Sequence, residues 1–293
     1  MNRVETHGQR GVIRTLIALS LAGGLLSGCG ANFISTEREI ALGEQAAPQF
    51  LSEGGGAIPD PLVMKYVSEV GRKVLAAVPD EERRDLPWEF HVLNSQVLNA
   101  FALPGGKVFI SRGLMVKLSN EAELAAVLGH EVGHVIHEHI GKQMTHQAVQ
   151  STVINVAVGA AGQMSDSQWI SVLGAGAETG GQLYLLSFGR EQELEADEAG
   201  LRLMVRAGYD PRGLLGVLRV LQEASGTAGG LEILSTHPHP ENRVAQAEEL
   251  ISTRYAGAVN NPQYVLGPEA YQSKALGPLS RLPPPADAEP AAE

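Results

Sequence analysis

Hydrophobic side chains recur at helical spacing along most of the chain. The segment that begins at Pro59 and Pro61 repeats apolar residues every three or four positions, at Val63, Tyr66, Val67, Val70 and Val74, as one face of a helix does. Similar spacing, with capping residues or prolines at the segment starts, predicts further helices over 36–48, from near Asn120, over 191–207, from Pro211 to about 223, and after Pro240. We therefore expect a mostly helical protein.

Two short segments alternate between apolar and polar residues, as half-buried strands do. They are residues 88–93 and 107–111, and Gly105-Gly106 before the second segment predicts a tight turn. These segments predict one small β-sheet beside the helices. The expected fold class is therefore α+β and mostly helical.

Composition and charge limit the classes of protein to consider. The chain has 293 residues, 44% of them hydrophobic, which is enough for one large domain or two small ones. Its formal net charge is -11, and no basic run follows the N-terminal segment. Because nucleic acids are bound through clustered lysine and arginine, nucleic acid is not expected as a partner. Residues 256–293 are rich in proline, and we expect a disordered tail there.

The N-terminal 28 residues have the pattern of a secretory signal peptide. Three arginines precede an apolar stretch over 15–28, which is too short and too rich in glycine for a convincing membrane span. The stretch ends at Cys29, the only cysteine, and the ending Leu-Ser-Gly-Cys resembles the bacterial lipobox. That resemblance implies cleavage before Cys29 and its lipidation, and Gly30 favours the outer membrane. The alternative is an ordinary signal peptide with an incidental cysteine.

Residues 141–189 are rich in glycine, alanine, valine and serine and carry little charge. Two apolar helices are expected there, near 148–162 and 168–186, and neither has the unbroken length of a confident membrane span. They can be core helices, or a lid or membrane-facing element.

The helix expected from Asn120 carries the motif His130-Glu131-Val132-Gly133-His134. Side chains at positions i and i+4 share one helix face, so the two imidazoles can bind one Zn²⁺. Glu131 beside them can take a proton from the attacking water. Asn120 and Glu123 predict a capping box at the start of this helix. Gly129 and Gly133 predict close approach of another backbone.

A third metal ligand must come from elsewhere in the chain. The metzincin pattern requires a further histidine where this chain has Ile140. His137 lies too far along the helix axis to close a tetrahedron with His130 and His134.

The segment over 191–197 offers carboxylates instead. Only Glu193 and Asp197 are four residues apart and share a helix face, so the first can bind zinc while the second accepts the free N–H of a zinc-bound histidine. Glu195 lies about 200° around the helix from Glu193 and is expected to face solvent.

This pair of motifs resembles the gluzincin family of CAAX prenyl proteases and HtpX-type membrane proteases. The match is closest to the periplasmic, outer-membrane-associated branch, which the segments 99–114, 187–197 and 235–243 also resemble. The resemblance covers about residues 36–255, and it implies a zincin-like metalloprotease domain there. Residues 29–35 would then be a lipid-anchored linker.

The resemblance also assigns roles to matching residues. One Zn²⁺ per chain would be held by His130, His134 and Glu193, and Glu131 would be the general base. His237 and Arg243 would stabilise the oxyanion, or His237 would occupy the open zinc position as a latch. An extended substrate would pair with an edge strand made of Lys107, Val108, Phe109, Ile110 and Ser111.

The function implied is a zinc-dependent endopeptidase of the bacterial cell envelope. Its partners would be unfolded or misassembled periplasmic and outer-membrane proteins as substrates, and the outer membrane through lipid on Cys29, facing the periplasm. The alternative is a non-enzymatic chaperone or outer-membrane assembly factor with a latched zinc site.

Overall fold

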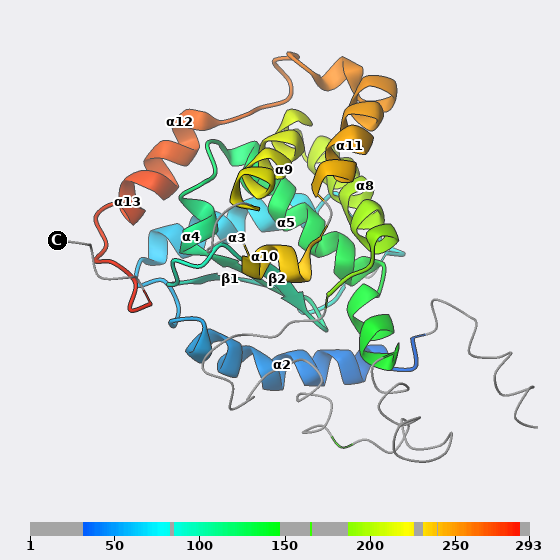
Figure 1. Cartoon of the computed structure of the whole chain (residues 1–293), viewed down its shortest axis with the longest axis vertical. Helices are drawn as coiled ribbons and strands as arrows, with labels where there is room; N and C mark the ends of the chain where they lie inside the picture. The colour runs from blue at the N-terminus through cyan, green and yellow to red at the C-terminus, as the bar shows by residue number, and fades with distance from the viewer. Residues whose placement is uncertain are drawn as a thin grey trace, which may run out of the picture.

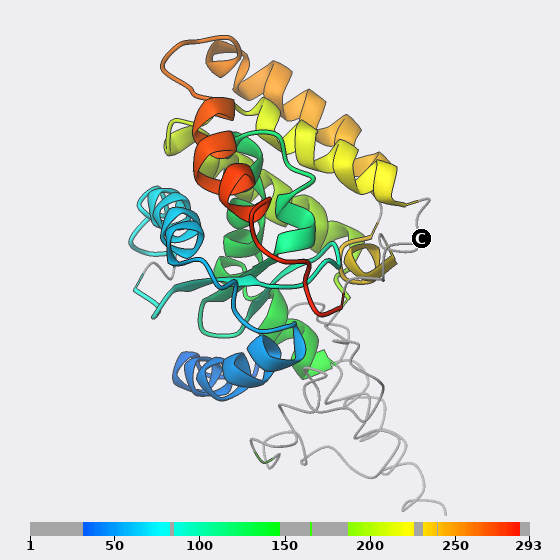
Figure 2. The same cartoon turned by 90° about the vertical axis from the view of Figure 1, so that its left-hand side faces the viewer.

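The chain folds into a three-stranded sheet enclosed by helices (Figures 1 and 2). This computed structural model describes residues 32–82, 85–146, 165, 187–225, 231–238 and 240–287. Helix α2 (Thr36–Glu53) covers one face of the sheet, and α5 (Glu121–Ile136) covers the other. The predicted α+β, mostly helical class is confirmed.

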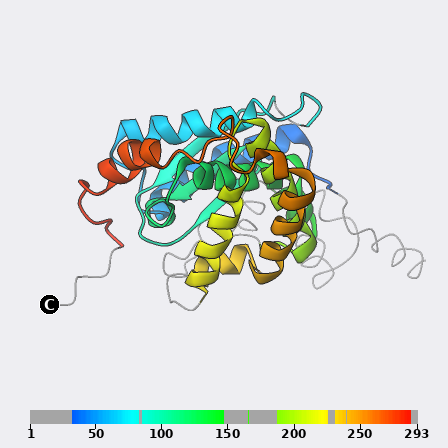
Figure 3. The same ribbon diagram turned by 90° about the horizontal axis from the view of Figure 1, so that it is seen from above.

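The remaining long helices surround α5. Helix α3 (Pro61–Leu75) packs against α5 and strand β1, while α8 (Arg190–Arg206) and α9 (Arg212–Ala224) pack along α5. Helix α11 (Pro240–Arg254) lies on α8 and α9, as Figures 1 and 3 show. The short helix α10 (Leu231–Thr236) joins α9 to α11. Helix α5 is therefore buried along nearly its whole length, and every residue from Ala122 to Val135 is buried.

The order of strands in the sheet corrects one sequence prediction. Strand β3 (Lys107–Ser111) lies in the centre, parallel to β1 (Glu89–Leu93) and antiparallel to β2 (Ala100–Leu103). Because β3 has a hydrogen-bonded strand on each side, the prediction that Lys107–Ser111 is the edge strand for a substrate is wrong. Strand β2 is at the edge instead. It escaped the search for alternating residues because all four of its side chains are buried.

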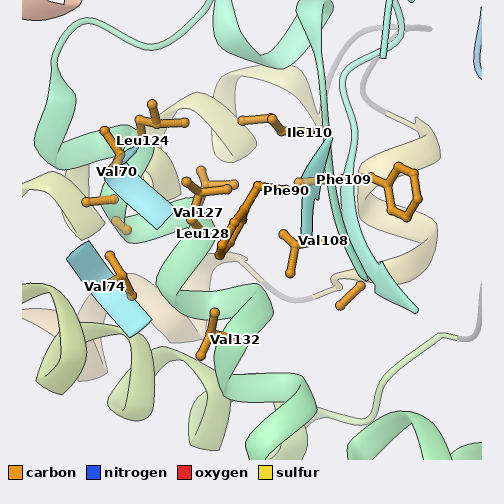
Figure 4. Close-up of a cluster of buried hydrophobic side chains, with 14 of the residues drawn as sticks. Val70, Val74, Phe90, Val108, Phe109, Ile110, Leu124, Val127, Leu128 and Val132 are labelled. Carbon is orange, nitrogen blue, oxygen red and sulfur yellow. The ribbon is translucent and has the colours of Figure 1, made fainter. Parts of the chain in front are cut away.

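Hydrophobic side chains fill both faces of the sheet. Figure 4 shows Phe90 of β1 and Val108 of β3 among side chains of α3 and α5, with Phe109 on the opposite side of β3. On that opposite side Phe109 stacks on Phe101 at 4.8 Å between ring centroids, and Phe101 meets Phe50 of α2 at 5.5 Å. The sheet thus fixes α2 and α5 on its two faces.

Asn120 caps the start of α5 as predicted, but Glu123 accepts from the Ser119 N–H and not from the Asn120 N–H that a capping box requires. The Asn120 side chain accepts a hydrogen bond from the Glu123 backbone N–H at 3.0 Å, and Glu123 accepts one from the Ser119 N–H at 2.6 Å. These bonds satisfy donors that the first turn of a helix leaves without partners. At α2 the cap is Ser35 rather than Thr36.

Glycines allow α8 to approach α5 unusually closely, as Gly129 and Gly133 predicted. A Cβ on Gly133 would lie 2.9 Å from the Ala196 carbonyl oxygen, and one on Gly200 would lie 2.8 Å from the His130 nitrogen. Real Cβ atoms essentially never approach other atoms that closely. The backbones of α5 and α8 therefore meet at positions where neither helix has room for a larger side chain.

The segment after α11 is ordered as far as residue 287, which corrects the prediction of a disordered tail from residue 256. It contains η3 (Ala256–Ala258), α12 (Pro268–Tyr271), the π-helix η4 (Gln272–Leu276) and α13 (Gly277–Leu279). Figure 3 shows this segment beside α3. Buried Tyr271, Ala275 and Leu279 recur every four residues. That apolar stripe outweighs the high proline content on which the prediction depended.

Two sets of hydrogen bonds fasten this C-terminal segment to α5 and to the end of the sheet. The carbonyls of Leu266 and Gly267 accept from the backbone N–H groups of Ala122 and Glu121, in the first turn of α5. The Arg112 guanidinium, directly after β3, donates to three carbonyls of the segment, those of Leu279, Leu282 and Pro283.

No helix in the described part of the chain is both long and apolar enough to cross a membrane. The predicted signal peptide, Cys29 and the apolar helices near 148–162 and 168–186 lie outside the described residues.

Candidate metal centre

Four buried side chains bring metal-binding atoms within 4.8 Å of one another: His130, His134, Glu193 and His237. The Nε2 atoms of His130 and His134 are 3.0 Å apart. Glu193 Oε1 lies 3.3 Å from His134 Nε2, and Glu193 Oε2 lies 3.6 Å from His130 Nε2. A tetrahedral ion bonded at about 2.0–2.1 Å has ligand atoms about 3.4 Å apart. The three predicted ligands therefore fit a divalent cation such as Zn²⁺.

Asp197 contacts His130 on the side away from the cluster, as the i, i+4 spacing predicted. Asp197 Oδ1 accepts from His130 Nδ1 at 2.9 Å. This bond places the proton of neutral His130 on Nδ1 and leaves the Nε2 lone pair for a metal.

Arg243 of α11 joins the two carboxylates of α8. Its Nε and Nη2 donate to the two oxygens of Asp197 at 2.6 and 2.7 Å, and its Nη1 donates to Glu193 at 2.5 Å. The resemblance implied a place beside the substrate carbonyl. In this structure the guanidinium instead faces the carboxylates, and it holds a metal ligand and the partner of another ligand in place.

The charges around these carboxylates keep them ionised. Burial raises the pKa of Glu193, but the charges of His237 and Arg243 and the hydrogen bonds outweigh burial, so its pKa lies well below the usual value. Burial likewise raises the pKa of Asp197, and Arg243 and His130 reverse that effect. Both groups are therefore carboxylates at neutral pH, as a metal ligand and an acceptor must be.

Glu131 differs from these two carboxylates in its environment. Burial raises the pKa of Glu131, against the opposing charges of His237 and His130. Its Oε2 is buried and has no hydrogen-bond partner among the described residues, and its Oε1 lies 3.6 Å from His237 Nε2. A buried carboxyl group with a free oxygen and a raised pKa is suited to accepting and returning a proton.

His237, directly after α10, completes the ligand cluster. Its Nδ1 lies 3.1 Å from Glu193 Oε1 and 3.3 Å from His130 Nε2, and its Nε2 lies 3.3 Å from the Ala100 carbonyl oxygen of β2. Burial lowers the pKa of His237, but Glu193 and Glu131 raise it to about 8. The adjoining cavity, lined by α5, α9 and α10, measures about 20 Å³, little more than the space of one water. The site is closed to a peptide in this arrangement.

His139 is a site residue that sequence reasoning missed. Its Nδ1 lies 3.0 Å from His134 Nδ1, and its Nε2 lies 3.0 Å from Glu195 Oε2. Glu195, expected to face solvent, is half-exposed and also contacts His137 at 3.1 Å. His139 lies beyond the end of α5, where helical spacing no longer predicts which side chains meet. Burial lowers its pKa to about 4, despite the opposing effect of Glu195.

Comparison with known proteins identifies a family and several relatives to which this chain is similar. A model of peptidase family M48 matches residues 61–251. The beta-barrel assembly-enhancing protease of Yersinia pestis is 31% identical over 231 residues, which cover 73% of this chain and 44% of that protein. The same-named protease of Escherichia coli K12 is 31% identical over 219 residues, with the same coverage of each chain.

A mitochondrial relative is similar to the same part of the chain. The mitochondrial metalloendopeptidase OMA1 of Schizosaccharomyces pombe is 33% identical over 225 residues, which cover 74% of this chain and 62% of that protein. The matches thus span less than half the length of the two bacterial proteases and under two thirds of the yeast one.

The contact between Asp197 and His130 predicts a loss of metal affinity in Asp197→Asn. The substitution removes the charge that fixes the proton of His130 and balances Arg243, so we expect zinc binding to weaken about 10–100-fold. Competition with a chromophoric chelator measures this change. Asp210→Asn is the matched control, because Asp210 is a buried aspartate paired with Arg212 away from the cluster. Equal losses in both variants would contradict the assigned role.

Proposed function

This chain belongs to peptidase family M48, and on that premise we propose that it is a zinc-dependent endopeptidase. The observation that carries the proposal is the free buried oxygen of Glu131, beside three side chains whose spacing fits a tetrahedral ion. Proteins named as metalloendopeptidases among its relatives support the same activity.

Each residue of the site would have a separate role in peptide hydrolysis. His130 and His134 would hold Zn²⁺ through Nε2, and Glu193 through its carboxylate. Bound zinc supplies a Lewis acid that lowers the pKa of water and polarises a carbonyl. Glu131 accepts the proton of the attacking water and passes it to the leaving amine. The raised pKa of Glu131 favours the first transfer, because it makes the carboxylate a stronger base and lets it hold the proton until the amine leaves.

The substrate would bind as an extended strand along β2. Within the described residues, the outer edge of β2 pairs with no other strand, and β2 lies against α5 beside the ligand cluster. Main-chain hydrogen bonds between strands depend little on sequence, so broad specificity for unfolded segments follows. We propose misfolded or misassembled envelope proteins as substrates. The name of the bacterial relatives, beta-barrel assembly-enhancing protease, supports that class.

His237 would control access to this site. Its ring contacts Glu193 and His130 and also the Ala100 carbonyl of β2. A peptide that pairs with β2 and reaches the ligand cluster needs the Ala100 carbonyl and the space beside Glu193 and His130, which the His237 ring occupies. His237 is therefore proposed to act as a latch that must leave before cleavage. In the open arrangement it could stabilise the oxyanion, as could Arg243 after movement.

The latch predicts that His237→Ala cleaves casein faster than the wild-type chain. The substitution frees the Ala100 carbonyl and the place beside Glu193 while leaving the three proposed ligands. Fluorescent casein release measures the rate, and the double variant with Glu131→Gln is the control that ties the gain to this site. A His237→Ala chain that keeps its zinc and loses cleavage would assign His237 to oxyanion stabilisation instead.

The role of Glu131 predicts that Glu131→Gln keeps zinc and loses cleavage. Glutamine has similar size but cannot accept the proton, and loss of a general base costs about 10²–10⁴ in rate. Casein cleavage and metal content of the same preparation test both halves of this statement. Cleavage at the wild-type rate would show that the assigned mechanism is wrong.

The second candidate is a chaperone or assembly factor that does not depend on cleavage. The observation in favour of this second function is the closed site, in which His237 lies within the ligand cluster. Rescue of outer-membrane assembly separates the two functions: a peptidase requires Glu131, whereas full rescue by Glu131→Gln would favour the chaperone.

Lipidation of Cys29 is proposed to hold the protein at the outer membrane, facing the periplasm. The arginines, the apolar stretch over 15–28 and the Leu-Ser-Gly-Cys ending support this location. An acylated N-terminus with more than one chain gives stable membrane attachment.

The anchor predicts that Cys29→Ala is neither labelled by radioactive palmitate nor retained in membranes. A cysteine thiol is needed for the lipid, and no second cysteine is present. Membrane fractionation, with Cys29→Ala and wild type compared in the same cells, measures the change. Unchanged retention of the variant would rule out the lipid as the anchor.

A further inference from the structure

The two histidines of the zinc motif present the same atoms to their surroundings. Each directs Nε2 toward the ligand cluster and Nδ1 away from it. Behind His130, the Nδ1 partner is a carboxylate, Asp197, at 2.9 Å. Behind His134, the partner is another imidazole, His139, at 3.0 Å. A carboxylate, Glu195, follows one step further out, 3.0 Å from His139 Nε2.

The proton positions in this second chain of contacts are determined by its ends. A carboxylate only accepts hydrogen bonds, so Glu195 requires a proton on His139 Nε2. Neutral His139 then has a lone pair on Nδ1, which requires the proton of His134 to lie on its own Nδ1. His134 Nε2 is thereby left with a lone pair, and a metal needs a lone pair there. The opposite order would place a proton on His134 Nε2, in the cluster.

We propose that His139, oriented by Glu195, is a positioning residue that fixes His134 in its metal-binding tautomer. This inference rests on the proposed metal site and deepens it. The relay through His139 does for His134 what Asp197 does for His130. The tautomers of the two ligand histidines are thus fixed by separate partners. Asp197 of α8 contacts His130 directly, whereas Glu195 of α8 acts on His134 through His139, which follows α5.

The backbone after α5 is shaped to bring His139 to this place. The helix ends at Ile136, and Glu138 adopts the left-handed conformation, with φ of 58°. This conformation is uncommon for residues other than glycine and costs about 1 kcal/mol or more. The next residue, His139, starts a further helical stretch and lies against His134, fully buried. The strain is stored where a metal ligand is oriented.

Neighbouring groups hold the His134 and His139 rings in contact with each other. Phe188 stacks on the His134 ring at 3.9 Å between centroids and 27° between planes. Lys142 donates to the His137 carbonyl at 2.8 Å and thereby ties down the turn. Before α2, Asn32 donates to Glu39, whose side chain packs against Gly141 in the helical residues that follow this turn. His134 has little freedom to rotate away from His139.

The outer end of the relay lies at the surface. The Glu195 side chain is 52% exposed and also contacts His137, whereas Asp197 is buried and paired with Arg243. Water can replace part of what Glu195 supplies. We therefore expect substitution of His139 to affect the metal site more than substitution of Glu195.

Substitutions of His139 that keep or remove the acceptor test the proposal. His139→Leu removes the acceptor and fills the space, and we expect the full chain to bind zinc about 10–100-fold more weakly. His139→Asn places an amide oxygen near the position of Nδ1, so it should recover most of the affinity. His137→Leu is the control, because His137 also contacts Glu195 but not a ligand. Melting of the metal-free chains verifies that each variant is folded.

Three results of this series would overturn the inference. The first is wild-type zinc affinity in a folded His139→Leu chain. The second is an equal loss in His139→Asn and His139→Leu, because packing alone would then account for the effect. The third is a loss in His137→Leu as large as that in His139→Leu, since the side-chain contacts of His137 are with Glu195 and His139.

Nitrogen NMR of the wild-type, metal-free chain tests the tautomer without any substitution. We expect His134 to carry its proton on Nδ1 and His139 on Nε2; protonation of His134 on Nε2 would overturn the proposal. This measurement separates the inference from the proposed function. A wild-type chain that binds no zinc would refute the endopeptidase, while the tautomer would still decide the role of His139.

Discussion

Close contact between α5 and α8 is the constraint on which the metal centre depends. The motif from His130 to His134 would supply two metal ligands from one helix, and the third would have to reach them from a neighbouring backbone. Gly133 and Gly200 remove the Cβ atoms that would separate the two helices. Glu193 and Asp197 then reach His130 and His134 from one face of α8. A larger residue at either glycine would move the carboxylates outward, so packing and chemistry are set by the same positions.

Because the site is buried, its negative charges must be compensated by positive charges close to them. Three carboxylates, Glu131, Glu193 and Asp197, lie within a region that is almost free of solvent. Isolated charges in such a place cost several kcal/mol each unless they are paired. Arg243 compensates Glu193 and Asp197 directly, and a divalent cation would supply the remaining positive charge. Burial raises the pKa of Glu131 and the charges of His237 and His130 do not offset it, whereas the pKa values of Glu193 and Asp197 fall.

Helical periodicity predicted the central part of the site, because both the zinc motif and the Glu193–Asp197 pair lie within regular helices. Three departures from prediction lie where regular spacing ends. Strand β2 has no alternation because both of its faces are buried, and this concealed the true edge of the sheet. His139 follows a left-handed residue beyond the helix, so no spacing rule connects it with His134. The order of residues 256–287 depends on packing against α3 and α5, which are distant in the sequence.

Those last contacts have a consequence for how the protein matures. The first turn of the metal helix is completed by the carbonyls of Leu266 and Gly267, and Arg112 is satisfied by Pro283, 171 residues later in the chain. Contacts between such distant segments form late, because the intervening loop must close first. Synthesis must therefore reach almost the end of the described chain before the metal helix acquires its last partners. A nascent chain of this protein therefore cannot complete the fold around its candidate metal centre before its C-terminal segment has emerged.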